Sequence, residues 1–475
     1  MPEVCDRQDA GGAKRDVAWI GLGACLAAAY LFPFVRVLFR LGDEGSTVYG
    51  AQLVAQGAVP YRDFFVENFG PGSYYLLAAF FKLFGITWVA ARLSVLVTGV
   101  STAMLVLWMT RRLCRGARSV LPALMVLLTG IPVWTGSNYH WDSSLFGLLA
   151  VAAFFLWQER QRYVFLVGAG VLAGITSCFL QQKGLLVCLG LLAAVPFVCR
   201  SQQPRRPVGR PLALLLGGYS LVGVLVLALF YRSGALRDLI QDCVVWPLTT
   251  YHGINRVGYA HGFHDTWQTW GVVVHNQLPA IAGDLARVVL LTPILFFLAL
   301  PVFLIALGAF SRLVPGGPAR LFGPRVLPYW TAGAGMWLSE LHRPDTFHLI
   351  YGAQLLVIVC FYAWVTCFER LDSVRKGGMV FVTASLLVWG TLKIIPPLSA
   401  SPVATRRGTI YMMRPDDALA FLQREVRSGD ETFVYPYYPM YYFLADIRNP
   451  TRHTILLYNL HTEQQFRDAI ASLEN

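Results

Sequence analysis

Charged side chains are scarce in this sequence: Asp, Glu, Lys and Arg make up 14% of its 475 residues, whereas hydrophobic residues make up 56%. A soluble domain of this length needs a more polar surface than this composition can provide. Apolar runs of roughly 17 to 25 residues recur along the chain, each long enough to cross a hydrocarbon layer of ~30 Å as a helix. There are about eleven such runs, which predict an all-α polytopic membrane protein.

The nine cysteines contain no C-x-x-C pair, so the sequence supports neither a zinc site nor a disulfide framework. Most of them lie inside apolar runs, where a cysteine acts as a small hydrophobic residue. The sequence also has no evident internal repeat. The net charge of +12 comes from short basic groups between apolar runs rather than from one basic face. It therefore indicates membrane topology and not nucleic-acid binding.

The basic groups fall at every second connection between apolar runs, which predicts a cytoplasmic N-terminus and a C-terminal tail outside. The first run, after Lys14 and Arg15, has no convincing cleavage site and is interpreted as a retained helix. We expect a cytoplasmic tail at 1–16, a membrane domain at 17–395 and a small outer unit at 396–475. The predicted crossings lie near 17–38, 88–110, 119–136, 143–158, 163–180, 184–199, 211–231, 287–310, 326–340, 349–368 and 378–395.

This topology, assigned from positive charge alone, places the unusual polar residues together near the outer face. Ionisable residues at membrane depth are costly and commonly functional, so their convergence predicts one outward-facing polar site. The residues are Asp43, Glu44, Arg62, Asp63, Asp142, Lys183, Arg343, Asp345 and His348.

Several outer segments do not cross the membrane. The first outer loop, 39–87, holds two stretches that are too short to span, 46–57 and 71–85, which we expect to form helices at the interface. The outer loop 232–286 is rich in His, Trp and Tyr and is expected to form a lid.

From about Pro396 the composition is that of a small α/β unit. Its predicted helices are 416–427 and 462–473, the second begun by a Thr462 to Gln465 capping box, and its predicted strands are 432–435 and 454–458. So small a unit has a poor core of its own, and we expect it to rest on the membrane domain.

An acidic pair follows the first helix, and Tyr-Arg-Asp and Pro-Gly follow before the second crossing. With these features the chain resembles the GT-C superfamily of polyprenyl-phosphate-sugar-dependent glycosyltransferases. The likeness is closest to the branch of protein O-mannosyltransferases and lipid A aminoarabinose transferases, and it covers about residues 17–395. The residues that carry it are Asp43-Glu44-Gly, Pro60-Tyr61-Arg62-Asp63, Pro71-Gly72, Asp142, Lys183 and His342-Arg343-Pro-Asp345 with His348.

The resemblance implies a sugar donor on a lipid phosphate and transfer outside the membrane with inversion, in a bacterial inner membrane protein. The acceptor would be a lipid, glycan or protein of the cell envelope. The implied chemistry needs a carboxylate to take the acceptor proton and cations to hold the departing phosphate. Asp43 is the candidate base, with Glu44 and Asp142 as further acidic residues. Candidate phosphate ligands are Lys183, Arg343, His348 and Arg62, supported by Tyr61, Asp63 and Asp345.

Simpler interpretations of these residues remain open at this point. Asp43 and Asp142 could be helix caps facing water, Lys183 could extend from a helix end toward the interface, and Arg343 with Asp345 could be a structural ion pair. Glu44 could instead help hold a divalent cation, although the resemblance requires no cofactor. The tyrosines at 435–442 are interpreted as an aromatic anchor at the interface, with sugar stacking as the alternative.

Two other functional classes compete with a glycosyltransferase. A transporter or flippase of lipid-linked glycans usually has paired halves and polar residues near the bilayer midplane, whereas the polar residues here lie toward one face. An envelope polysaccharide polymerase or ligase also uses lipid-linked sugars, but it is not expected to carry the acidic pair and the interfacial helices. A non-catalytic binder of lipid-linked glycan would differ from the enzyme in having no turnover.

Overall fold

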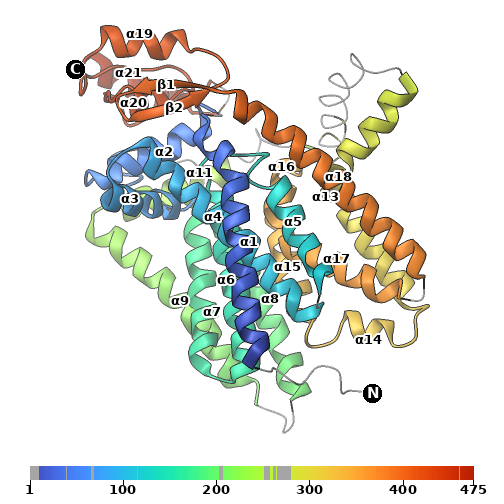
Figure 1. The fold of residues 1–475 in the computed structure, drawn as a ribbon. Helices are drawn as coiled ribbons and strands as arrows, with labels where there is room; N and C mark the ends of the chain where they lie inside the picture. Colours follow the sequence, from blue (N-terminus) through green and yellow to red (C-terminus); the bar gives the residue numbers. More distant parts are fainter. Residues whose placement is uncertain are drawn as a thin grey trace.

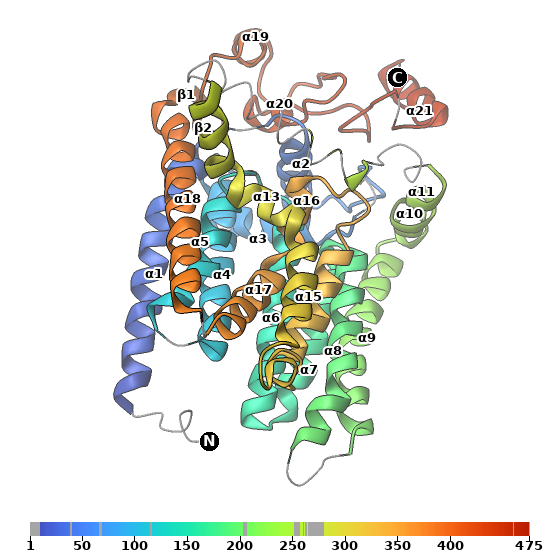
Figure 2. The ribbon, with the colours of Figure 1, turned by 90° about the vertical axis from the view of Figure 1, so that its right-hand side faces the viewer.

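The computed structural model describes residues 10–474, apart from 39, 66–68, 115, 203–206, 251–256, 260, 262–263, 265–279, 370 and 459. Most of it is a bundle of long helices, with a small terminal unit at one end (Figure 1). The N-terminal end of α1 lies at the opposite end of the bundle (Figures 1 and 2). Most of 251–279, in the middle of the predicted lid, falls outside the described residues. Its described part holds α10 (Leu236–Ile240), a π-helical turn (Gln241–Val245) and α11 (Trp246–Thr249).

Within the described residues, seven helices are long and apolar enough to cross a membrane. An eighth candidate is the pair α16 (Thr346–Gly352) and α17 (Gln354–Cys367), which bends by 75° at its break. The seven are α1 (Ala10–Arg36), α4 (Trp88–Leu113), α6 (Tyr139–Arg160), α8 (Gln181–Ser201), α9 (Gly209–Arg232), α13 (Ala280–Ser311) and α18 (Asp372–Ser399).

The other predicted crossings form shorter helices, so the count of eleven stays a prediction. They are α5 (Val120–Thr129), α7 (Tyr163–Phe179) and α15 (Leu327–Leu338). The segment 119–136 does not continue as one helix, because α5 ends at Thr129 and is capped by Gly130, two residues before Pro132. Two short helical turns also occur between these helices, at Ala117–Ser119 and in α14 (Gly317–Leu321).

Close helix packing depends on glycine at a few positions. Helices α7 and α9 meet where Gly170 and Gly218 leave no side chain between the two backbones. A methyl group on Gly170 would overlap the carbonyl oxygen of Leu215. Small residues of this kind let membrane helices approach each other closely.

The first outer loop forms two helices where the sequence predicted them. They are α2 (Asp43–Ala55) and α3 (Gly72–Phe84). Gly85 ends α3 with a positive φ of 83°, a conformation that glycine adopts without strain. Both helices lie at the end of the bundle nearest the terminal unit (Figure 1).

The terminal unit contains two predicted helices and a sheet in an unpredicted place. Helices α19 (Asp417–Glu425) and α21 (Glu463–Glu474) match the predictions, and the Thr462 backbone N–H donates to Gln465 Oε1 at 2.8 Å as a capping box requires. A further short helix, α20 (Met440–Leu444), was not predicted. The sheet is an antiparallel hairpin of β1 (Ser401–Thr405) and β2 (Gly408–Met412).

The predicted strands at 432–435 and 454–458 are therefore wrong. Glu431 and Arg448 form only an isolated bridge beside the first of them. The true hairpin was hidden because Pro402 lies in its first strand, and proline normally argues against a strand. Its turn uses Gly408 with φ 109° after two arginines.

The terminal unit packs on the first outer loop. The backbone N–H groups of Leu38 and Trp88 donate to Tyr411 and Arg407 at 2.8 Å each. Buried residues of α2 and α3 share one hydrophobic cluster with buried residues of α20. Within it the rings of Tyr49 and Tyr442 stack at 4.9 Å. This is the packing expected for a unit too small to form its own core.

Candidate functional site

One carboxylate organises the segment between α15 and α16. Asp345 caps the N-terminus of α16, accepting the backbone N–H of His348 at 3.1 Å. The same carboxylate contacts the His348 ring Nδ1 at 2.8 Å and accepts Arg343 Nε at 2.9 Å. Burial raises the pKa of Asp345, but the hydrogen bond and charge of His348, together with Arg343, outweigh it and hold the pKa below its ordinary value. Asp345 thus orients Arg343 and His348 together.

Asp43, the first residue of α2, is exposed and lies within electrostatic range of Arg343 and His348. Poorly polar surroundings raise the pKa of Asp43, and the charges of Arg40, Arg343 and His348 oppose that rise. Tyr437 of the terminal unit donates a hydrogen bond to Asp43 Oδ1. The structure therefore places a carboxylate near an arginine and a histidine that follow it by about 300 residues in the sequence. We call Asp43, Arg343, Asp345 and His348 the front layer.

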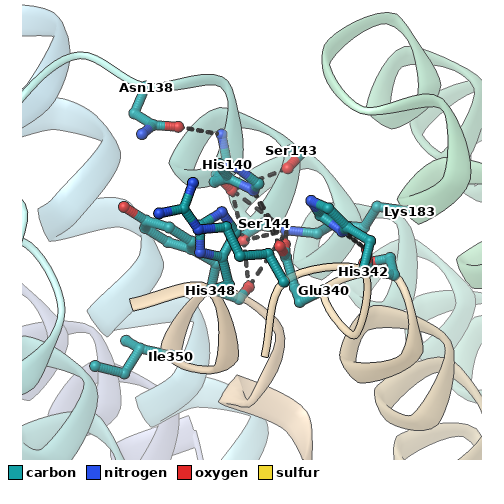
Figure 3. A network of polar contacts seen from close by, with 12 residues as sticks. Asn138, His140, Ser143, Ser144, Lys183, Glu340, His342, His348 and Ile350 are labelled. Atoms are coloured by element: carbon teal, nitrogen blue, oxygen red, sulfur yellow. Dashed lines mark hydrogen bonds and ion pairs between the residues drawn. The ribbon is translucent and has the colours of Figure 1, made fainter. Parts of the chain in front are cut away.

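Lys183 lies in a buried polar network that also includes His140, Ser144 and Glu340 (Figure 3). Its Nζ is 2.7 Å from Glu340 Oε1 and donates to Ser144 Oγ at 2.9 Å. Longer contacts of 3.4 Å join it to the carbonyl oxygens of His140 and Tyr351. Lys183 and Glu340 both have 0% of the side chain exposed. In this conformation the Lys183 side chain is not accessible to a phosphate. Its role in donor binding therefore stays a prediction.

His140 connects this network with the front layer. Its Nδ1 is 3.1 Å from Glu340 Oε2, and its ring centroid lies 4.9 Å from that of His348. The backbone N–H of His140 donates to the side chain of Asn138, which caps α6. We call His140, Ser144, Lys183 and Glu340 the back layer. Figure 3 shows these four side chains converging from α6, α8 and the end of α15.

Glu44 points away from this cluster and forms a buried ion pair. Arg92 of α4 lies 2.6 Å from Glu44 Oε1 through Nη1 and donates to Oε2 at 2.9 Å through Nη2. Arg92 also donates to the carbonyl oxygens of Val37 and Thr135. These contacts fix the start of α2 against α4, so the structure gives Glu44 a structural contact where the sequence predicted a catalytic one.

Asp142 is also buried away from the front layer. It accepts Ser73 Oγ at 2.6 Å and lies 3.5 Å from Thr98 Oγ1, and so joins α6 to α3 and α4. The helix cap that the simpler interpretation gave to Asp142 is supplied by Asn138 instead. The described contacts of Asp142 thus favour a packing role over a catalytic one.

The Tyr-Arg-Asp segment forms a tight turn against α9. The Arg62 guanidinium pairs with Asp63 and donates to the carbonyl oxygen of Ser233 at 2.7 Å. Asp63 also accepts the backbone N–H of Val59 at 2.7 Å. Tyr61 is buried with φ 70° and donates to the carbonyl oxygen of Phe69 at 2.9 Å. Within the described residues, the contacts of this turn do not include the front layer, so the phosphate-binding role of Arg62 stays a prediction.

Sequence reasoning missed four residues of this arrangement: Arg92, His140, Glu340 and Tyr437. Glu340 could have been found from the sequence. It is a single acidic residue at the end of an apolar run, and the predicted topology places it on the same side of the membrane as Lys183, which predicts a buried pair. Tyr437 gave no such signal, since the tyrosines around it favour an interfacial anchor equally well. Among the described residues there is no group of three or more His, Cys, Asp or Glu arranged to hold a metal ion.

Two cavities lie away from the front layer. A small apolar one lies between α1, α4 and α5, lined by residues that include Leu31, Gly99 and Ile131. A more open one lies at the junction of α9 and α10, lined by residues that include Tyr231, Arg237 and Gln241.

Comparison with known proteins gives structural neighbours but no sequence relatives. No protein-family model and no curated protein matches the sequence. The crystal structure of ArnT from Cupriavidus metallidurans bound to undecaprenyl phosphate aligns with a TM-score of 0.54 and 12% identity, over 96% of this chain and 88% of that one.

The Archaeoglobus fulgidus oligosaccharyltransferase, crystallised with Zn and sulfate, aligns with a TM-score of 0.53 and 16% identity over 93% of this chain. This chain spans 62% of the length of that protein. Both neighbours are GT-C glycosyltransferases. With its apolar helices, the chain is a multi-pass membrane protein that has the fold of the GT-C membrane glycosyltransferases.

Proposed function

We propose that this protein is a glycosyltransferase that moves a sugar from a polyprenyl-phosphate carrier to a lipid, glycan or protein of the cell envelope. The GT-C fold supports the general class, and the undecaprenyl phosphate bound to ArnT supports a polyprenyl-linked donor. One observation carries the proposal for this chain: Asp43, at the start of α2, lies within electrostatic range of Arg343 and His348, which the carboxylate of Asp345 holds together.

In the proposed reaction Asp43 takes the proton of an acceptor hydroxyl. The hydroxyl oxygen then forms a bond to the anomeric carbon from the face opposite the phosphate. The bond between that carbon and the phosphate oxygen breaks, its electron pair passes to the phosphate, and the configuration inverts. Arg343 and His348 stabilise the phosphate charge, because arginine can bind two phosphate oxygens at once and both groups are already oriented by Asp345.

The back layer holds the front layer in place. Lys183 and Glu340 neutralise each other, and Glu340 orients His140 beneath His348. Glu44 fixes the start of α2 through Arg92, so it places Asp43 without touching the reacting atoms. No metal ion has a step in this mechanism.

The proposed orientation follows the basic segments. The N-terminal end of α1, a helix that includes Lys14 and Arg15 near its start, lies opposite the terminal unit, and α14 with its arginine lies toward the same end as that N-terminus (Figure 1). Positive charge favours the cytoplasmic side. We therefore place the front layer and the terminal unit outside, in a bacterial inner membrane.

The experiment uses purified full-length protein and undecaprenyl phosphate carrying a radiolabelled hexose or aminoarabinose. Label released to water or transferred to an envelope extract measures turnover. A positioned base typically supplies about 10²- to 10⁴-fold, so Asp43→Asn should lower turnover by that factor. The matched control is Asp468→Asn on α21, whose exposed carboxylate contacts Gln464 on the same helix. Turnover in Asp43→Asn equal to that of the control would refute the assignment of Asp43.

A further inference from the structure

The loop before α20 packs directly on the residues around Asp43. The backbone N–H of Met440 donates to the carbonyl oxygen of Leu41 at 3.1 Å. Gly45 lies against the backbone of Met440, and Gly42 lies against the ring of Tyr437. A methyl group at either glycine would overlap these neighbours. Because residues 42 and 45 have no side chains, the terminal unit can contact the chain on either side of Asp43 and Glu44, the first two residues of α2.

One hydrogen bond joins the loop before α20 to the front layer. The Tyr437 hydroxyl donates to Asp43 Oδ1. Among the described residues, the charged groups that act on Asp43 are Arg40, which lies just before α2, and Arg343 and His348 from the α16 segment. Within the described residues no hydrogen bond is recorded for Asp43 Oδ2, so that oxygen is open to an acceptor hydroxyl.

We propose that Tyr437 is a positioning residue for the catalytic carboxylate and that the terminal unit thereby forms part of the active site. The hydroxyl fixes Asp43 through one oxygen and leaves the other free to accept the proton. This inference rests on the proposed function, since it assumes that Asp43 is the base. It assigns a role to the terminal unit that the fold alone does not give.

Two consequences distinguish this role from simple packing. A hydrogen bond donated to a carboxylate stabilises its charged form and lowers its pKa. Loss of the Tyr437 hydroxyl should therefore move the acid limb of the activity profile to higher pH, by about one unit for a single charge-assisted bond. The donor phosphate is held elsewhere, by Arg343 and His348, so the KM for the donor should not change.

The first test compares Tyr437→Phe with Tyr438→Phe in the full-length protein. Tyr438 is an exposed neighbour whose ring contacts Tyr441. For Tyr437→Phe we expect kcat to fall about tenfold or more, an upward shift of the acid limb and an unchanged donor KM. Tyr438→Phe should match the unmodified protein in all three. An unchanged kcat and an unchanged acid limb in Tyr437→Phe would overturn the proposal.

The second test reads the contact without turnover. With 3-nitrotyrosine incorporated at position 437, the visible absorbance reports ionisation of that phenol alone. The neighbouring carboxylate disfavours the phenolate, so Asp43→Asn should lower the pKa of the label, and Asp468→Asn should not. A label pKa that ignores Asp43 would overturn the inference, whatever the turnover of Asp43→Asn. A label pKa that responds, with full turnover in Asp43→Asn, would instead reject the proposed base.

Gly42→Ala provides a second variant that leaves both polar groups present. The new methyl group would overlap the Tyr437 ring and move it away from Asp43. We expect the same upward shift of the acid limb as in Tyr437→Phe, with little further effect when the two changes are combined. Additive shifts of the acid limb in the double variant would contradict a shared mechanism.

Discussion

Lys183 and Glu340 form a fully buried pair whose removal has a predictable cost. Their charged atoms lie 2.7 Å apart, and neither side chain has any exposed surface. Breaking such a pair by removing one partner typically costs about 3–5 kcal/mol, because the other charge stays buried and unpaired. That cost changes the ratio of folded to unfolded protein by about two to four orders of magnitude.

The perturbation is a cycle of Lys183→Met, Glu340→Gln and the double variant. Each single change leaves one buried charge, whereas the double variant leaves none. In the double variant the glutamine oxygen can still accept from His140 Nδ1, which lies 3.1 Å from the Glu340 carboxylate. We therefore expect the free energy of unfolding to fall by about 3–5 kcal/mol in each single variant, and the double variant to recover most of that loss. Unfolding by sodium dodecyl sulfate in mixed micelles measures the free energies.

The same cycle decides between two roles for Lys183. If Lys183 holds the donor phosphate directly, the folded double variant should lose a charge-assisted hydrogen bond, and its donor KM should rise by about tenfold or more. The back-layer role predicts a donor KM within about threefold of the unmodified protein. Additive losses of stability, or a large rise in donor KM in the double variant, would refute the reasoning.

Three further predictions concern the front layer and its support. Glu44→Gln leaves the charge of Arg92 buried and unpaired, so the free energy of unfolding in mixed micelles should fall by about 3–5 kcal/mol. Turnover per folded molecule should stay well above that of Asp43→Asn. Arg343→Lys keeps the charge but loses the paired phosphate contacts, so steady-state kinetics should show a higher donor KM, whereas Arg467→Lys on α21 should change nothing. Because the protein atoms around Asp43 raise its pKa and the base must be ionised, kcat/KM should fall with decreasing pH at a value above the usual aspartate range of about 3.9. The residual activity of Asp43→Asn should lack this acid limb.

The helix positions could be predicted from the sequence because hydrophobic length and turn residues act locally. The boundaries of α4, α7 and α9 agree with the prediction within about three residues, in line with the known uncertainty of helix ends. The two helices of the first outer loop were also found, since Pro71 and Gly85 mark the limits of the second. Asp345, Arg343 and His348 were found because charged residues stand out in an apolar chain.

The partners of those charges could not be predicted, because they depend on tertiary packing. Glu44 and Asp43 are neighbours in the sequence, but successive helical residues face different directions, and only the fold decides that Glu44 meets Arg92. The contact between Tyr437 and Asp43 joins residues 394 apart. No local pattern contains that information.

A structure of the protein with undecaprenyl phosphate, determined by electron cryomicroscopy in a lipid nanodisc, tests the central claim most directly. We expect the phosphate between Arg343 and His348, on the side that faces Asp43 Oδ2. A phosphate bound beside Arg62 and Ser233, or at the junction of α9 and α10, would contradict the account.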